Sequence, residues 1–339
     1  MERYYKQMLF APIGSEGQKD ISQKKVVIVG AGALGSTVSE TLARAGVGEL
    51  IIIDRDFVDI TNLQRQQLYT EKDVKNKMPK AIAAKKRLKK INSEIKVKAY
   101  IKDATPQVLN EIVQGAAVIL DATDNFDIRF IINDIAHKHN IPWIYGAVIG
   151  SYGISFNVIP NESPCLNCLL KTIPLGIATC DTVGVISPAV QIVAAHQVTE
   201  ALKILTNNYK SLRSKLITFD IWENNSQSID VVALKDEACL TCGNNREYPY
   251  LSLKNQTQTA VLCGRKSVQI RPPHGNTNLS LNSLKNTFES LGLKTIYNQF
   301  LISCNIDDIS ITIFKDGRAI IHGTTDILLA KNIYHRFLG

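Results

Sequence analysis

The sequence predicts an α/β protein with a doubly wound, mainly parallel sheet that carries an antiparallel extension, followed by a small α+β domain. Three observations lead to this fold class. A continuous apolar run at residues 26–29 precedes a glycine turn and a helical pattern, as expected of a strand buried on both faces. Strand and helix patterns then alternate up to about residue 148. After Gly150, apolar and polar residues alternate instead, which is typical of antiparallel strands.

The glycine turn has the spacing G-x-G-x-x-G, formed by Gly30, Gly32 and Gly35. The first glycine permits the tight turn, the second lets a phosphate approach the backbone, and the third lets the helix pack on the strand. The helix N-terminus suits an anion because it offers free N–H groups and a positive dipole end. Asp54 ends the next strand, where a carboxylate accepts from ribose hydroxyls and repels a 2′-phosphate. This register favours a Rossmann-like nucleotide site over a glycine turn without a ligand.

The elements that follow Asp54 continue the parallel pattern. A polar loop leaves the second strand, and a basic helix begins at Lys80. In chain order we then expect a strand at 95–101, a strand at 117–120, a helix to about 140, a strand at 141–148, a strand at 151–159, a helix at 188–205, and strand-like runs at 215–221 and 228–234. Connections between the parallel strands should be right-handed.

Residues from about 250 onward form a separate predicted unit. Its expected elements are strands at 267–270, 295–303, 309–314 and 319–322, with helices at 281–291 and 325–337. Asp316 and Gly317 form a hairpin turn signal, and Thr324 or Thr325 should cap the last helix. We therefore predict a large doubly wound domain at 1–248 and a small domain at 249–339, whose role does not follow from its sequence.

The overall composition limits the class of protein. With 339 residues, of which 45% are hydrophobic, the chain can bury a sizeable core. No apolar run reaches about 18 residues, and the N-terminus lacks a signal-peptide core, so we expect a cytoplasmic protein without a membrane partner. The net charge of +8 is concentrated between Lys72 and Lys90 without interleaved aromatic residues, so we expect no nucleic-acid partner. A nucleotide substrate and an acidic protein partner both fit the sign of the charge.

Four of the seven cysteines form two C-x-x-C pairs, Cys165 with Cys168 and Cys239 with Cys242. In a cytosolic protein such pairs point to metal or thiol chemistry rather than to disulfides. One pair alone is compatible with a redox dithiol, whereas two pairs supply the four thiolates of a closed tetrahedral zinc site. A closed site has no open coordination position, so we expect a structural Zn²⁺. The alternative is thiols that only pack or cycle.

Polar residues follow successive strands of the predicted sheet. Asn62 and Arg65 lie in the loop after Asp54, Lys80 opens the basic helix, and Asp124 follows the strand at 117–120. Arginine and lysine neutralise phosphate charge, and a carboxylate can hold a magnesium ion between phosphate oxygens. Each of these residues alone is more simply a surface side chain. Their common place at the carboxyl edge of a parallel sheet favours a triphosphate site.

The motifs together resemble the bacterial E1-like adenylyltransferases of the HesA/MoeB/ThiF family. The shared motifs are G-A-G-A-L-G, N-L-Q-R-Q at 62–66, P-K at 79–80, D-A-T-D-N at 121–125 and the two C-x-x-C pairs. They occur in the family's order across roughly residues 3–245. The resemblance implies an enzyme that uses ATP to activate the C-terminal glycine of a ubiquitin-like sulfur carrier as an acyl-adenylate. Pyrophosphate is released, and a thiocarboxylate forms later.

The resemblance also implies roles for individual residues. It places Asp54 on the ribose, with Asn62, Arg65 and Lys80 on the phosphates. It places Asp124 on Mg²⁺ and the four paired cysteines on Zn²⁺. The carrier stays open: a MoaD-like molybdopterin-synthase subunit ranks modestly above the ThiS-like carrier of thiazole and thiamine synthesis. A cysteine desulfurase or another sulfur donor would be a further partner.

Two residues stand where the family has functional side chains. Family members read R-Y-x-R-Q near the N-terminus, and their second arginine reaches into the partner subunit's ATP site. This chain reads R-Y-Y-K-Q, so Lys6 takes that place, which keeps the charge but loses the bidentate fork. The resemblance therefore implies a homodimer with composite sites. Cys180, in T-C-D-T-V-G, occupies the place of a candidate catalytic cysteine, and the alternative is an unused loop thiol.

Two other classes of function compete with adenylation. An NAD-dependent oxidoreductase fits the glycine turn, but it leaves Arg65, Lys80 and the zinc site without a role and supplies no hydride-transfer pair. A non-catalytic nucleotide-binding scaffold is favoured only by Lys6. ATP–pyrophosphate exchange, with and without a carrier protein, separates these readings.

Overall fold

The computed structural model describes residues 2–172, 184–252, 259–262, 266–270, 279–306 and 308–338. The chain divides into two compact units, Met1–Asn255 and Gln256–Gly339. Each unit has its own sheet and its own core, so the two are described separately. Within the described part of the chain, no helix is long and apolar enough to cross a membrane.

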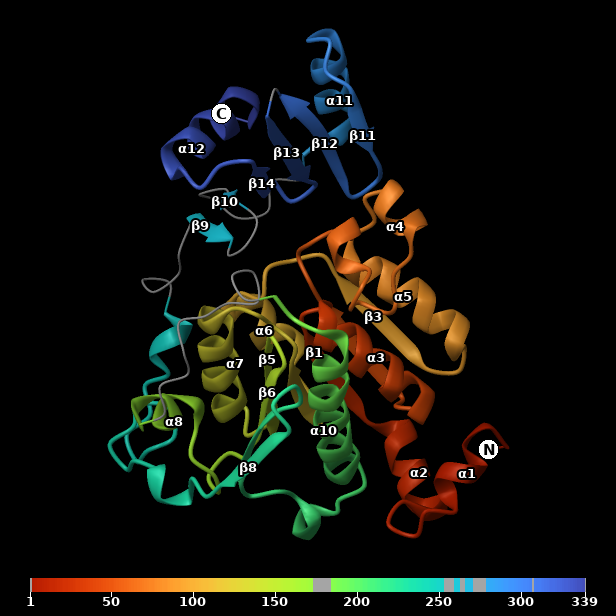
Figure 1. Ribbon diagram of the computed structural model, residues 1–339, viewed down its shortest axis with the longest axis vertical. Helices are drawn as coiled ribbons and strands as arrows, with labels where there is room; N and C mark the ends of the chain where they lie inside the picture. The colour runs from red at the N-terminus through yellow and green to blue at the C-terminus, as the bar shows by residue number, and fades with distance from the viewer. Residues whose placement is uncertain are drawn as a thin grey trace. The chain divides into compact units, whose positions relative to one another are not determined.

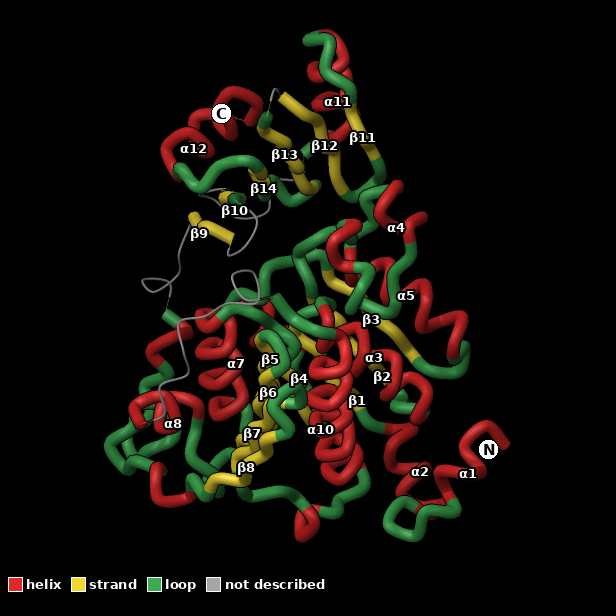
Figure 2. Tube along the Cα trace, in the orientation of Figure 1, coloured by secondary structure: helices red, strands yellow, loops and turns green. Residues whose placement is uncertain are grey.

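The first unit is built on an eight-stranded sheet of order β3-β2-β1-β4-β5-β6-β7-β8, visible in Figure 2. The strands from β3 to β5 in this order are parallel, and β6, β7 and β8 are added antiparallel. The strands are β1 Lys25–Val29, β2 Glu49–Ile53, β3 Lys96–Tyr100, β4 Val118–Asp121, β5 Trp143–Ile149, β6 Tyr152–Val158, β7 Leu216–Asp220 and β8 Asn225–Ile229. This mixed sheet confirms the predicted fold class.

Helices cover both faces of this sheet (Figure 1). One face carries α2 (Gly14–Gln23), α3 (Ala33–Ala45), α5 (Lys80–Ile91) and α10 (Ser187–Leu205); the other carries α6 (Pro106–Ile112), α7 (Phe126–Lys138) and α8 (Leu166–Thr172). Shorter helices are η1 Glu2–Tyr4, α1 Tyr5–Met8, η2 Ile60–Asn62, α4 Glu71–Lys75, η3 Tyr209–Ser211, η4 Val232–Leu234 and η5 Pro249–Leu251.

The central strands are apolar throughout because both of their faces are buried. Val26 and Ile28 of β1 enter the core on the α3 side, whereas Val27 and Val29 enter the core on the α7 side. This alternation follows from the two-residue period of a strand. Burying one such side chain contributes about 1.5–3 kcal/mol before the entropy cost.

The strand order reverses between β1 and β4. The chain runs outward from β1 through β2 to β3 and then returns to place β4 beside β1, with Val29 opposite Asp121. The loops that leave the carboxyl ends of β1 and β4 therefore run to opposite sides. In doubly wound sheets the crevice at such a switch point is where ligands bind.

The N-terminal segment is more ordered than its sequence predicts. It forms η1, α1 and α2, with Tyr4 and Ile21 buried. The side-chain amides of Gln7 and Gln18 both donate to the carbonyl of Ala45, each at 3.0 Å, at the last turn of α3. Long-range contacts of this kind stabilise short helices that local propensity does not predict.

The second unit contains a six-stranded antiparallel sheet of order β11-β12-β13-β14-β10-β9 with two helices. Its elements are β9 Thr259–Leu262, β10 Ser267–Ile270, α11 Leu281–Ser290, β11 Thr295–Tyr297, β12 Leu301–Ile306, β13 Ile309–Phe314, β14 Ala319–His322 and α12 Ile327–Leu338. Its core includes Phe288 of α11 and Tyr334 of α12. This is the small α+β unit that the sequence predicts.

Three predicted elements differ in detail. The run at 295–303 is two strands, because Asn298 accepts from the N–H groups of Phe300 and Leu301 and turns the chain. The last helix is capped by Asp326, which accepts from Leu328 N–H at 2.8 Å, rather than by Thr324 or Thr325. The run at 228–234 is the end of β8 followed by η4.

Candidate functional site

The glycine turn joins β1 to α3, and two of its glycines are required by close backbone contacts. Gly30 has φ of +100°, and a Cβ there would lie 2.4 Å from the Ala122 carbonyl oxygen. A Cβ on Gly35 would lie 2.0 Å from the Gly30 carbonyl oxygen. Side chains at either position would collide with backbone. A Cβ on Gly32 would meet only Gln66 Nε2, at 3.9 Å, so a ligand can approach the N-terminus of α3 there.

Asp54 lies directly beside this turn. Its Oδ2 accepts from the N–H of Ala31 at 2.7 Å, and its Oδ1 accepts from the N–H of Asp56 at 2.7 Å. These bonds fix the carboxylate, and each oxygen retains a lone pair for a ligand hydroxyl. Burial raises the pKa of Asp54, and the positive charge of Lys80 opposes that rise.

Lys80 is buried at the first position of α5, with 5% of its surface exposed. Its Nζ lies 3.2 Å from Asp56 Oδ2, and its backbone N–H donates to the Asp56 carbonyl at 2.9 Å. A buried ammonium is costly unless it is paired, and Asp56 supplies the charge here. Lys80 is thus held at the carboxyl end of β2, next to Asp54.

Asn62 and Arg65 follow on η2 and the turn after it. Asn62 is fully buried, and its Oδ1 accepts from the N–H of Asp59 at 3.3 Å as part of a capping box. Arg65 is partly exposed and donates to the Thr61 carbonyl at 2.9 Å. Among the described residues Arg65 forms no ion pair, so its charge is free to meet an anionic ligand.

The loop after β4 carries Asp124, which is exposed. The buried Arg129 of α7 holds this loop in place. Its Nε donates to Asp121 Oδ2 at 3.0 Å, and its Nη2 donates to the Thr123 carbonyl at 2.7 Å. Asp121 also accepts from the N–H and the hydroxyl of Thr123. Sequence reasoning missed Arg129; the available signal was a charged residue within the apolar helix pattern that follows D-A-T-D-N.

These residues lie together at the carboxyl ends of the central strands β1, β2 and β4. The three glycines, Asp54 and Lys80 are linked through Ala31 and Asp56, and Gly30 contacts Ala122 of the loop that carries Asp124. Gln66, one residue after Arg65, approaches Gly32. The predicted nucleotide residues therefore converge on the switch point. Cys180 lies outside the described residues.

Lys6 is not part of this cluster within one chain. Its neighbours Arg3 and Gln7 are held by the carbonyls of Ile91 and Ala45, whereas Lys6 is exposed. Ala45 ends α3, and the glycine turn lies at the other end of this 13-residue helix. A helix of that length measures about 20 Å. Lys6 is therefore too far from its own glycine turn to contact a ligand there.

The four paired cysteines gather into one buried cluster. The Sγ atom of Cys165 lies 3.8 Å from that of Cys168 and 3.6 Å from that of Cys239. The Sγ atoms of Cys168 and Cys242 are 3.5 Å apart. All four ligand atoms fall within 4.8 Å of one another. Sulfur atoms bound to one tetrahedral zinc at about 2.3 Å are about 3.8 Å apart. The donor set and spacing therefore fit a closed zinc site.

Helix α7 supports this cluster from the sheet side. Thr241, between the second pair of cysteines, donates to Asp134 Oδ1 at 2.6 Å, and Tyr250 N–H donates to Asp134 Oδ2 at 2.8 Å. Burial raises the pKa of Asp134 to about 6. Asn167, between the first pair, donates to the Thr241 hydroxyl at 2.8 Å. Such bonds around a metal site fix its ligand loops.

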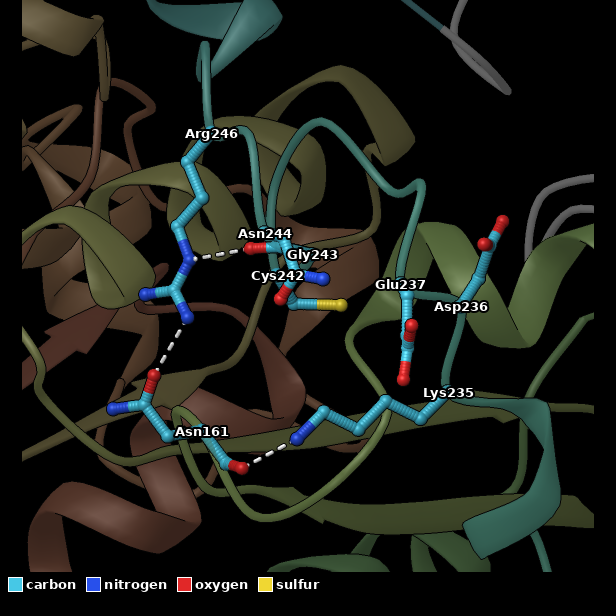
Figure 3. A pocket seen from close by; sticks show the side chains of 8 residues that line it. All are labelled: Asn161, Lys235, Asp236, Glu237, Cys242, Gly243, Asn244 and Arg246. Carbon is cyan, nitrogen blue, oxygen red and sulfur yellow. Dashed lines mark hydrogen bonds between the residues drawn. The ribbon is translucent and has the colours of Figure 1, made fainter.

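A hollow of about 400 Å³ opens beside the cluster (Figure 3). Arg246 spans it, donating to the Gly243 carbonyl at 3.0 Å and to Asn161 Oδ1 at 2.7 Å. Lys235 donates to the Asn161 carbonyl. Both cations are thus engaged in tying the 235–246 segment to the turn after β6. We assign this hollow a structural role.

The fold and these two regions define a class: a doubly wound protein of the nucleotide-binding type with a four-cysteine cluster that could hold a metal ion. The chain belongs to the ThiF family, whose match spans residues 4–241. It is 50% identical over 337 residues to the sulfur carrier protein ThiS adenylyltransferase of Bacillus subtilis (strain 168), covering 99% of each chain. The family resemblance that the motifs predict is confirmed.

Two other relatives show how far the likeness extends. The molybdopterin-synthase adenylyltransferase of Salmonella typhimurium is 29% identical over 244 residues, covering 72% of this chain and 96% of its own. A crystal structure of Escherichia coli MccB with ATP superimposes with a TM-score of 0.58 at 26% identity, covering 67% of this chain and 68% of that one. The likeness to the Bacillus subtilis relative therefore includes the second unit, whereas the family match ends at residue 241.

Proposed function

We propose that the chain is an ATP-dependent adenylyltransferase that activates the C-terminal glycine of a ubiquitin-like sulfur carrier as an acyl-adenylate. Pyrophosphate is released, and the adenylate is the precursor of a thiocarboxylate. The observation that carries the proposal is the convergence of Asp54, Lys80 and the N-terminus of α3 at the switch point of the sheet. Family membership and the names of the relatives agree with this chemistry.

In this proposal each residue at the edge has one role. Asp54 accepts from the ribose hydroxyls, and its charge disfavours a 2′-phosphate. Asn62, Arg65 and Lys80 bind the phosphates, with Lys80 exchanging part of its bond to Asp56 for a phosphate oxygen. Asp124, an exposed carboxylate, would hold Mg²⁺, which supplies charge neutralisation between phosphate oxygens.

The reaction needs positioning rather than covalent catalysis. The carrier's carboxylate attacks the α-phosphorus, an oxygen–phosphorus bond forms, and the bond to the pyrophosphate leaving group breaks. The nucleophile is already ionised at neutral pH, so no general base is required. The chain's task is to align the two reactants and to stabilise the charge that develops on the phosphates. Arg65 and Lys80 supply the positive charge that stabilises it.

The share of the chain that each relative matches indicates which carrier is the substrate. Identity to the ThiS adenylyltransferase extends over 99% of both chains, so it includes the second unit. The molybdopterin-synthase relative covers 72% of this chain at 29% identity. We therefore propose a ThiS-like carrier as the substrate and keep as the alternative a MoaD-like carrier, which the sequence analysis ranks modestly higher although the motifs are shared by both branches. The sulfur would come from a cysteine desulfurase or a related donor.

Four further proposals complete the enzyme. The cysteine cluster holds one structural Zn²⁺, and the protein acts in the cytoplasm. The active unit is a homodimer in which Lys6 reaches the partner's ATP. Its support is the position of Lys6 at the far end of α3, beside exposed Tyr5, Leu9 and Phe10, which suit a protein interface. Cys180 would act in the later sulfur step.

ATP–pyrophosphate exchange tests the function. Purified chain is mixed with labelled pyrophosphate, ATP, Mg²⁺ and either a ThiS-like or a MoaD-like carrier. We expect exchange that depends on the carrier and is faster with the ThiS-like protein. A carrier that lacks its C-terminal glycine is the matched control and should support none. If neither carrier supports exchange and the chain binds NADP tightly, an oxidoreductase function would replace adenylation.

A further inference from the structure

One buried side chain at the proposed nucleotide site, Gln66, has no hydrogen-bond partner among the described residues. Gln66 is 4% exposed, and its Oε1 is buried without a hydrogen bond. Its Nε2 also makes no hydrogen bond within the described part of the chain, and it faces Gly32 at 3.9 Å from the place of a Cβ. Leaving a buried amide oxygen unpaired lowers the stability of the folded chain. Such a group in a folded protein calls for a reason.

The two neighbouring glutamines show that this environment is particular to Gln66. Gln64 and Gln67 are both exposed, and Gln67 accepts from Gln191 Nε2 at 3.0 Å. The three residues share one short segment, so residue type and local backbone do not explain the difference. Gln66 is the one whose amide is directed at the first turn of α3.

We propose that Gln66 is a further nucleotide-binding residue, whose Nε2 donates to a phosphate oxygen seated beside Gly32. This rests on the proposed function. A phosphate that approaches Gly32 occupies the space that a Cβ would fill, and Nε2 lies 3.9 Å from that point. An oxygen within this gap comes into the hydrogen-bond range of 2.7–3.2 Å. The N–H groups of the first turn of α3 approach the same phosphate from the other side.

The amide complements the charged residues around it. Arg65 and Lys80 supply positive charge, and they attract any polyanion. Gln66 is neutral and fixed by burial, so it selects the position of one phosphate rather than adding to the general attraction. In the free protein Nε2 has no acceptor among the described residues, and a bound phosphate would supply one, whereas the buried Oε1 stays unpaired. The residue is therefore expected to favour ligand binding at the expense of ligand-free stability.

The test uses the full chain with Gln66→Met and Gln66→Glu, and Gln64→Met as the matched exposed control. Calorimetric titrations with ATP, AMP and adenosine are compared with the melting temperature of the ligand-free protein. We expect Gln66→Met to weaken ATP about 10- to 100-fold. Gln66→Glu should weaken it further, because the carboxylate repels phosphate. Adenosine, which has no phosphate, should bind both variants as it binds the wild-type chain.

The ligand-free melting temperature separates binding from structure. If Gln66 binds the nucleotide, the Gln66→Met variant keeps or raises the ligand-free melting temperature, because an unpaired polar group has been removed. A lower melting temperature with equal losses for ATP and adenosine would make Gln66 a structural residue and overturn the inference. Unchanged ATP affinity in both variants would also overturn it. A wild-type chain that binds no ATP would overturn the proposed function and this inference together.

Discussion

The nucleotide edge and the cysteine cluster are both built from loops at the ends of elements, yet they differ in how their polar groups are satisfied. Around the cysteines, the Thr241 hydroxyl accepts from Asn167 Nδ2 and donates to Asp134, which ties the two ligand loops to α7, although Asn167 Oδ1 is buried without a partner among the described residues. At the carboxyl ends of β1 and β2, Arg65 has no ion pair and the side chain of Gln66 has no hydrogen bond within the part of the chain that the structure describes. A closed region suits a permanent metal, whereas an edge with unused donors suits a ligand that arrives and leaves.

The largest effect should follow from opening the closed region. Cys239→Ser is expected to lose zinc and to lower the melting temperature strongly, because structural zinc contributes directly to folding. Metal analysis and calorimetry measure the two effects. Cys304→Ser, which replaces a buried cysteine of the second unit outside the four-cysteine cluster, is the control, and this variant should keep its zinc. Zinc retained in Cys239→Ser would remove the four-cysteine assignment.

The next largest effect concerns the buried support of the edge. Arg129→Met leaves Asp121 as an unpaired buried carboxylate, so we expect a loss of about 3–5 kcal/mol in the free energy of unfolding. Denaturant unfolding measures it. Arg87→Met, an exposed arginine of α5, should stay within about 0.5 kcal/mol. Equal stability of the two variants would show that the Arg129–Asp121 pair does not hold the loop.

Substitutions at the proposed nucleotide site should leave the fold intact but slow the reaction. Asp124→Ala and Arg65→Ala are each expected to slow adenylate formation by about 10²–10³, because each removes a charge-stabilising group. Melting temperatures should stay near that of the wild-type chain, since Asp124 is exposed and Arg65 is partly exposed. Near-normal pyrophosphate exchange in either variant would show that the triphosphate lies elsewhere.

The smallest effect is a partial recovery of activity. Lys6→Ala and Asp124→Ala chains should each be nearly inactive, and mixing them should restore one complete site in each mixed dimer. At most half of the sites in that dimer can recover, because the other site lacks both residues. No recovery in a confirmed mixed dimer would mean that Lys6 does not act on its partner's nucleotide.

Much of the fold and part of the site could be predicted from local patterns. The glycine spacing, the acidic residue after β2 and the two C-x-x-C pairs are each set by neighbours in sequence, so Gly30, Asp54 and the cysteines can be picked out as candidates from the sequence alone. Arg129, Asp56 and Gln66 were missed because their importance comes from contacts between segments far apart in the chain. The N-terminal helices were missed for the same reason, since Ala45 stabilises them through Gln7 and Gln18.

The account depends most directly on the open edge being the place where a carrier is adenylated. Intact-mass analysis of a ThiS-like carrier, incubated with the chain, ATP and Mg²⁺ without a sulfur donor, tests this in one measurement. We expect the carrier to gain the mass of one AMP moiety, to gain it about 10²–10³ times more slowly when Arg65→Ala replaces the wild-type chain, and to gain none when the terminal glycine is deleted. A carrier of unchanged mass in the presence of wild-type chain with bound ATP would contradict the account.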